Sequence, residues 1–97
     1  MRVISRKALK TYWKEHPAAH EVLNEWYRKI KQIKAETIVE LRKTFPTADV
    51  VGNCVVFNAG GNKYRVITRI NFRREIVYIR FVLSHAEYSK ERWKTDC

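Results

Sequence analysis

His85 and Tyr88 stand three residues apart directly after the last apolar strand of the chain, and Lys90 follows them. A histidine titrates near neutral pH, and a tyrosine supplies a phenolic proton. With nearby arginines, such groups can cleave RNA through its own 2′-hydroxyl. One group takes the 2′ proton, another protonates the departing 5′ oxygen, and arginines stabilise the pentavalent phosphate without a metal ion. This pair alone is a weak signal, because a His and a Tyr after a strand are usually structural.

Cations are concentrated in the strands before this pair. The chain of 97 residues has 20 Lys and Arg against 10 Asp and Glu, which gives a net charge of +10. The stretch from Lys63 to Arg80 has six basic residues and a single acid, Glu75. Such an excess favours a polyanionic partner, with nucleic acid first and an acidic protein second. The clustering disfavours the alternative, a merely solvated basic surface.

Gly60 and Gly61 separate two apolar segments and could either cradle a phosphate or turn a hairpin. A phosphate-binding glycine loop leads into a helix, where backbone amides meet the anion. Here the glycines lead into another strand. We therefore predict a tight hairpin centred on the two glycines, which sets Phe57 opposite Tyr64.

A second turn, centred on Arg73 and Arg74, sets Arg69 opposite Tyr78 and Arg65 opposite Val82. Because opposed residues share a face, the two turns give the same division of side chains. The apolar face, predicted to pack beneath helices, carries Val55, Phe57, Tyr64, Val66, Ile70, Val77, Ile79, Phe81 and Leu83. The other face is predicted to be exposed and suited to a phosphodiester backbone, and it carries Lys63, Arg65, Arg69, Tyr78 and Arg80.

The elements that must position these residues follow from periodicity. Apolar residues recur every three or four positions over residues 18–34, which predicts an amphipathic helix. A shorter helix precedes it, with Ser5 as its N-cap and Pro17 at its end. The capping-box pattern that opens residues 37–43 predicts a third helix.

Segments rich in Val, Ile, Tyr and Phe predict strands near residues 2–5 and over 54–57, 64–71 and 76–83, with a loop over 47–53. This order predicts an α+β fold, in which an N-terminal strand and two to three helices pack on one face of an antiparallel β-sheet. The length predicts a single domain over residues 1–97.

The remaining composition indicates a cytoplasmic protein with no metal site. Cys54 and Cys97 are too few for a disulfide framework, so we expect Cys54 to be a buried apolar residue and Cys97 to fray. No cluster of Cys and His has the spacing of a zinc site. No apolar run approaches the roughly 18–20 residues of a membrane span, and the first residues lack the apolar region of a secretory signal.

Residues 56–66, 76–82 and 85–88 resemble the HigB toxins of the RelE superfamily, and the similarity extends into the helical half through residues 41–46. The combination of F-N-x-x-G-N-x-Y-R with H-A-E-Y is specific. The resemblance implies a RelE-like fold and a metal-independent endoribonuclease, without a cofactor, that cleaves mRNA in the ribosomal A site and so inhibits translation. It also implies a HigA-like helix-turn-helix antitoxin as the partner that neutralises the toxin.

The resemblance assigns roles unevenly. Arg65 matches the strand arginine that acts on the scissile phosphate, while His85 and Tyr88 match the region that supplies the acid and the base. Which of the two is the base stays open. Further RNA or phosphate contacts are expected from Lys63, Arg69, Arg73, Arg74, Arg80 and Lys90.

Three alternatives differ from an enzyme. The first is a non-catalytic module that binds RNA or the ribosome through its basic sheet. The second is a DNA-binding regulator, which is disfavoured because no helix pair shows a base-reading helix-turn-helix pattern. The third is an interaction domain for an acidic protein.

Overall fold

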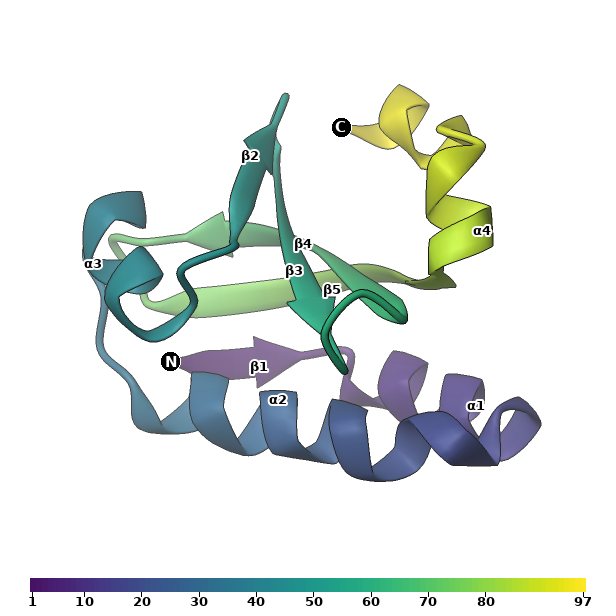
Figure 1. The fold of residues 1–97 in the computed structure, drawn as a ribbon. Coiled ribbons are helices and arrows are strands. Elements are labelled where there is room, and N and C mark those ends of the chain that lie inside the picture. Colours follow the sequence, from purple (N-terminus) through teal and green to yellow (C-terminus); the bar gives the residue numbers. More distant parts are fainter.

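The computed structural model describes residues 1–97 as one sheet with helical segments on both of its faces (Figure 1). The α+β prediction is confirmed. None of the helices has the length and apolar character needed to cross a bilayer. In chain order the elements are β1 (Arg2–Ile4), α1 (Arg6–Glu15), the 3-10 turn η1 (Pro17–Ala19), α2 (His20–Gln32), α3 (Ile38–Thr44), β2 (Asp49–Val51), β3 (Cys54–Ala59), β4 (Tyr64–Asn71), β5 (Ile76–Ser84), α4 (His85–Ser89) and the 3-10 helix η2 (Arg92–Asp96).

The sheet has the strand order β1-β5-β4-β3-β2, which corrects the predicted antiparallel sheet in one place. Strand β1 runs parallel to β5 and pairs Arg2 with Ile76, whereas the other neighbours are antiparallel. Strand β2 is a second correction, because it lies in the predicted loop. A tight turn through Gly52, whose φ is 57°, joins β2 to β3.

Helices α1 and α2 lie side by side beneath the sheet (Figure 1). Pro17 ends the first helix and opens η1, as predicted. Ser5 precedes α1 but makes no capping hydrogen bond, because its φ of 73° turns it away from cap geometry. At α3 the predicted cap forms, and Thr37 Oγ1 accepts a hydrogen bond from the backbone N–H of Glu40 at 3.2 Å. The amphipathic prediction for α2 is confirmed, since its buried residues are Leu23, Trp26 and Ile30.

The main core lies between the sheet and these helices, and Phe57 is at its centre. The Phe57 ring makes edge-to-face contacts with Trp26 at 5.3 Å and with Phe45 at 5.0 Å between centroids. Val66 and Ile79 are buried in the same core, as predicted. Burial of these apolar side chains is the dominant force that holds the helices to the sheet.

The first hairpin has a different register from the predicted one. Phe57 pairs with Val66, and Tyr64 pairs with Ala59, because the loop contains four residues instead of two. Gly60 and its neighbour both adopt positive φ, at 64° and 66°, as the hairpin interpretation requires. The register differs by two residues, and side chains alternate with a period of two, so the predicted faces of β3 survive the error.

The second hairpin contains a bulge that does change the faces. Arg69 pairs with Tyr78 as predicted, but the register shifts between Ile67 and Thr68. Beyond that point Arg65 pairs with Leu83 instead of Val82. A shift of one residue exchanges the two faces of a strand. The prediction that Phe81 and Leu83 pack beneath the helices is therefore wrong, and Val82 takes that side.

The exchanged residues join a smaller apolar cluster on the opposite face of the sheet. Its buried members are Cys54, Val56, Ile67 and Trp93, and Phe81, Leu83 and Tyr88 pack against them. Residues 85–97, which we call the covering segment, lie over this face (Figure 1). Cys54 is buried as predicted, but Cys97 is not frayed, because the two cysteines form a disulfide.

Candidate active site

Strand β4 carries Arg65 on the predicted face, but the side chain is not exposed. Only 7% of Arg65 is accessible, because the covering segment lies over this end of the sheet. The prediction that Arg65 is exposed is therefore wrong, although its side chain does point away from the helical core. Arg69, Tyr78 and Arg80, farther along the same face, are exposed as predicted.

Hydrogen bonds hold the Arg65 guanidinium over the first hairpin. Nη1 donates to the carbonyl oxygens of Asn62 and Tyr64 at 3.2 and 3.1 Å, and Nη2 donates to Asn62 Oδ1 at 2.6 Å. A guanidinium has five N–H donors. Two of them, one on Nη2 and one on Nε, remain without a protein partner and could meet a phosphate oxygen.

Helix α4 begins where β5 ends, and a capping box sets its start. Ser84 Oγ accepts from the backbone N–H of Glu87 at 3.2 Å, and Glu87 Oε1 accepts from the backbone N–H of Ser84 at 3.0 Å. This N–H donor, despite the opposing effect of burial, holds the pKa of the Glu87 carboxyl below its ordinary value. The carboxylate is thus kept ionised, and the helix begins at His85 with its side chain exposed.

The turn of α4 brings the proposed acid and base residues beside Arg65. His85 and Tyr88 lie one helical turn apart, a spacing that sets Cβ atoms about 5–6 Å from each other. The backbone N–H of His85 donates to the carbonyl of Lys63 at 2.9 Å, which joins α4 to the first hairpin. The Arg65 Cζ atom lies 5.0 Å from the centroid of the Tyr88 ring. Tyr88 therefore contacts Arg65, and His85 lies one turn earlier on the same helix; we call these three residues the cluster.

The remaining cations fall into three places along the sheet. Lys63 and Lys90 flank the cluster, and both are exposed. Arg69 and Arg80 occupy the middle of the face, where Arg69 Nη2 donates to the carbonyl of Asp96 at 2.7 Å. The turn between β4 and β5, which carries Arg73 and Arg74, lies at the opposite end of the sheet from α4 (Figure 1). Because β5 has nine residues, about 25–30 Å separate this turn from the cluster.

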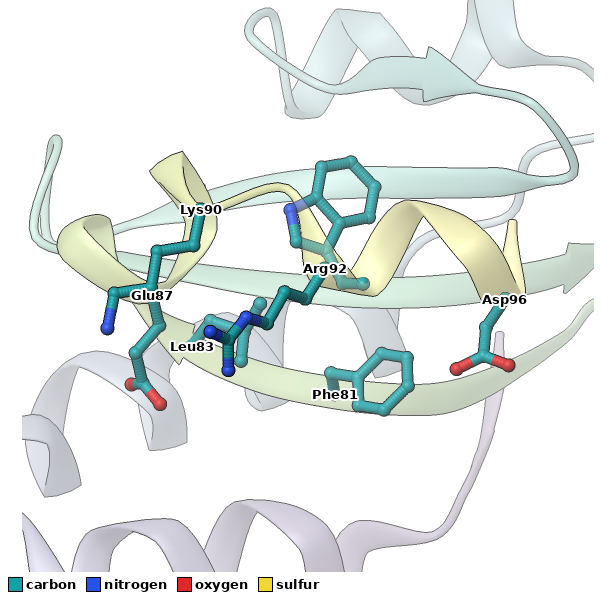
Figure 2. A pocket seen from close by; sticks show the side chains of 7 residues that line it. Phe81, Leu83, Glu87, Lys90, Arg92 and Asp96 are labelled. Carbon is teal, nitrogen blue, oxygen red and sulfur yellow. The ribbon is translucent and has the colours of Figure 1, made fainter.

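A cavity of about 310 Å³ lies between β5 and the covering segment, beside α4 (Figure 2). Its lining is both apolar and charged, and consists of Phe81, Leu83, Glu87, Lys90, Arg92, Trp93 and Asp96. The covering segment contributes the two carboxylates of this lining, Glu87 and Asp96. Arg92 and Lys90 project into the same cavity and add cations to its rim (Figure 2).

Comparison with known proteins shows the family to which this chain belongs. A model of the HigB toxin family, described as the RelE-like toxic component of a toxin-antitoxin system, matches residues 19–91. The chain belongs to the HigB toxin family. The match includes the whole Arg65, His85 and Tyr88 cluster, whereas residues 92–97 lie outside it.

Several curated HigB proteins are similar to nearly the full chain. The mRNA interferase HigB of Escherichia coli O6:H1 is 32% identical over 93 residues, which cover 93% of this chain and 90% of that protein. The mRNA interferase toxin HigB of Escherichia coli K12 is 32% identical over 91 residues, covering 91% of this chain and 88% of the relative. The mRNA interferase HigB of Shigella flexneri has the same values.

Two features of this HigB family member were missed from its sequence. Helix α4 was not predicted, although Ser84 and Glu87 have the S-x-x-E spacing of a capping box. Arg92 and Trp93 were also missed, and there a local signal is lacking. The placement of Trp93 depends on contacts with Cys54, Val56 and Ile67, about 25–40 positions earlier, so only the folded chain reveals it.

The capping box makes the stability of α4 depend on pH. Because the folded pKa of Glu87 is lowered from 4.5, its contribution is fully present above that value and is lost as the pH falls through the folded pKa. We expect amide hydrogen exchange in residues 85–89 to accelerate relative to the rest of the protein on acidification. In Glu87→Gln this acid dependence should be largely absent, and a wild-type response in the variant would contradict the assignment.

Proposed function

We propose that this chain is a ribosome-dependent mRNA endoribonuclease, the toxin of a toxin-antitoxin pair, which cleaves mRNA in the ribosomal A site and thereby inhibits translation. The observation that carries the proposal is the cluster of Arg65, His85 and Tyr88 at one end of a basic sheet face. The family and the names of its curated members support the same reaction class.

The proposed reaction uses the nucleophile of the substrate itself. The 2′-hydroxyl oxygen attacks the adjacent phosphorus, the bond from phosphorus to the 5′ oxygen breaks, and a 2′,3′-cyclic phosphate remains. Of His85 and Tyr88, one removes the 2′ proton and the other protonates the leaving 5′ oxygen. The two unpartnered N–H groups of Arg65 meet the extra negative charge on the phosphate oxygens in the transition state. Protein groups suffice for each step, so the proposal includes no metal ion or cofactor.

Ribosome dependence fits the small size of this cluster. Three side chains on a short helix and a strand offer little surface with which to hold a flexible mRNA in reactive geometry. A ribosome that fixes the codon would supply the positioning, which is worth orders of magnitude in effective concentration. Lys63, Arg69, Arg80 and Lys90 would then contact phosphates of mRNA or rRNA.

The decisive experiment compares ribosome-bound with free mRNA. Purified protein should cut mRNA in programmed ribosomes within the A-site codon, and mapped ends after induced expression should show the same positions. His85→Ala and Tyr88→Phe should bind ribosomes and lose cleavage. Rapid cleavage of free RNA would contradict the ribosome dependence. Ribosome binding without any cleavage would favour the alternative, a non-catalytic RNA- or ribosome-binding module.

The partner proposed for this chain is a HigA-like helix-turn-helix antitoxin. Support comes from the family description, which places such toxins in toxin-antitoxin systems. A small helix-turn-helix protein encoded beside this one should restore growth when both are expressed and should copurify with the toxin. Growth arrest that persists despite the neighbouring protein would argue against the pair.

The two arginines at the far end of the sheet provide a contrast to the cluster. Arg73→Ala or Arg74→Ala should weaken ribosome association modestly and lower the salt dependence of binding by about 0.7 in log–log slope for each lost phosphate contact. Single-turnover cleavage at saturating toxin should stay close to wild type, because this turn lies far from α4 (Figure 1). A large loss of saturated rate would place the turn at the reacting phosphate and overturn the site.

A further inference from the structure

Trp93 ties the covering segment to the sheet. It belongs to η2 and is only 4% accessible, buried with Cys54, Val56 and Ile67 of the strands. This residue lies beyond the part of the chain that matches the HigB family model, residues 19–91.

Trp93 also sets the position of Tyr88. The two rings stack at 4.9 Å between centroids with 14° between their planes, and Trp93 Nε1 donates to the backbone carbonyl of Tyr88 at 2.9 Å. Helix α4 has only five residues, and a helix this short is not stable by itself. The orientation of Tyr88 toward Arg65 therefore depends on the ring beneath it.

Few contacts hold η2 in place apart from Trp93. Asn53 donates its backbone N–H to the Cys97 carbonyl at 2.7 Å, and Arg69 donates to the Asp96 carbonyl at 2.7 Å. The disulfide between Cys54 and Cys97 links the end of this segment covalently to strand β3. Cys54 is fully buried and Cys97 is half-buried, so a thiolate can reach the Cys97 sulfur first.

We infer that Trp93, anchored by the Cys54–Cys97 disulfide, is a positioning residue for Tyr88, so that the disulfide-bonded protein cleaves RNA faster than the reduced one. The inference rests on the proposed nuclease function. The reductant is a dithiol: its thiolate attacks Cys97 Sγ, the bond between the two cysteine sulfurs breaks, and Cys54 leaves as a thiolate that takes a proton. The second thiol of the reductant then displaces Cys97 and closes the reductant's own disulfide, which completes a two-electron exchange.

The first test compares oxidised and dithiothreitol-reduced wild-type protein, with thiol titration to confirm each state. Single-turnover cleavage on saturated ribosomes should fall by about tenfold to a hundredfold on reduction, with ribosome binding unchanged. The Cys54→Ser, Cys97→Ser double variant should match reduced wild type and should not respond to dithiothreitol. Equal rates in the two states, or a faster reduced protein, would overturn the inference.

A second pair of variants tests the ring with the disulfide intact. Trp93→Ala should lower the saturated rate to the level of the reduced protein, whereas Trp93→Phe, which can still stack, should recover most of it. Circular dichroism checks that both variants are folded. If Trp93→Ala cleaves at the wild-type rate, Trp93 does not position Tyr88.

A readout without cleavage separates the inference from the nuclease proposal. Amide hydrogen exchange over residues 85–93 should accelerate on reduction, while exchange in α2 stays the same. If no form of the protein cleaves mRNA, the proposed function fails. The exchange data still test whether the disulfide and Trp93 hold α4 in place. Unchanged exchange over residues 85–93 would overturn the inference even in an active nuclease.

Discussion

Arg65→Ala is expected to lower single-turnover cleavage of ribosome-bound mRNA by about 10²–10³-fold. The strand and three hydrogen bonds fix this guanidinium, so it needs no reorganisation to meet the charge of the transition state. A preorganised donor of this kind contributes more than a mobile surface cation. The loss should appear in the saturated rate, while ribosome association survives because the exposed cations remain.

Two companion variants show what Arg65 does. Arg65→Lys keeps the charge but cannot reproduce the planar fork that reaches both Asn62 and the phosphate, so it should recover little of the rate. Arg74→Ala is the matched control, since it removes an arginine at the far end of the sheet. If Arg65→Ala cuts at the wild-type rate at saturating toxin, Arg65 serves docking and its catalytic role is wrong.

Phe57→Ala is expected to lower the free energy of unfolding by about 3–5 kcal/mol. The side chain is completely buried and packs edge-to-face against Trp26 and Phe45, so its removal leaves a cavity between α2, β3 and the end of α3. Domains of this size are commonly stable by only about 5–15 kcal/mol. Urea denaturation followed by circular dichroism measures the change directly.

Val39→Ala is the control for this substitution. Val39 is 67% exposed on α3, and alanine has the higher helix propensity, so stability should change by about 0.5 kcal/mol or less. A similar loss in both variants would mean that the assay reports general damage. A loss below about 1 kcal/mol in Phe57→Ala would place the centre of the core elsewhere.

The sequence was most informative where structure is local. Side-chain alternation gave the faces of β3 and the start of β4 even though the hairpin register was wrong, because a two-residue error preserves alternation. The bulge in the second hairpin was not predicted, and its shift of one residue does change which face a side chain lies on. It inserts one residue near Arg80, has no glycine to mark it, and sends Phe81 and Leu83 to the other face.

The site was harder to predict than the sheet. Arg65, His85 and Tyr88 were all named from the sequence, and in the structure Tyr88 contacts Arg65 while His85 lies one turn earlier on α4. The exposure of Arg65 was misjudged because it depends on residues 85–97, which fold back over the sheet. The disulfide was missed for a related reason: 43 positions separate its cysteines, and nothing local indicates that they meet.

The parallel pairing of β1 with β5 has a consequence for how the protein folds during its synthesis. Arg2 bonds with a strand that begins at Ile76, and its backbone N–H donates to the Glu75 carbonyl at 2.8 Å. During synthesis the first strand therefore has no partner until most of the chain has left the ribosome. Such long-range pairing is slow to form and gives a high contact order. The cluster of Arg65, His85 and Tyr88 spans β4 and α4, and α4 follows the last strand, so these three residues come together only after most of the chain has been made.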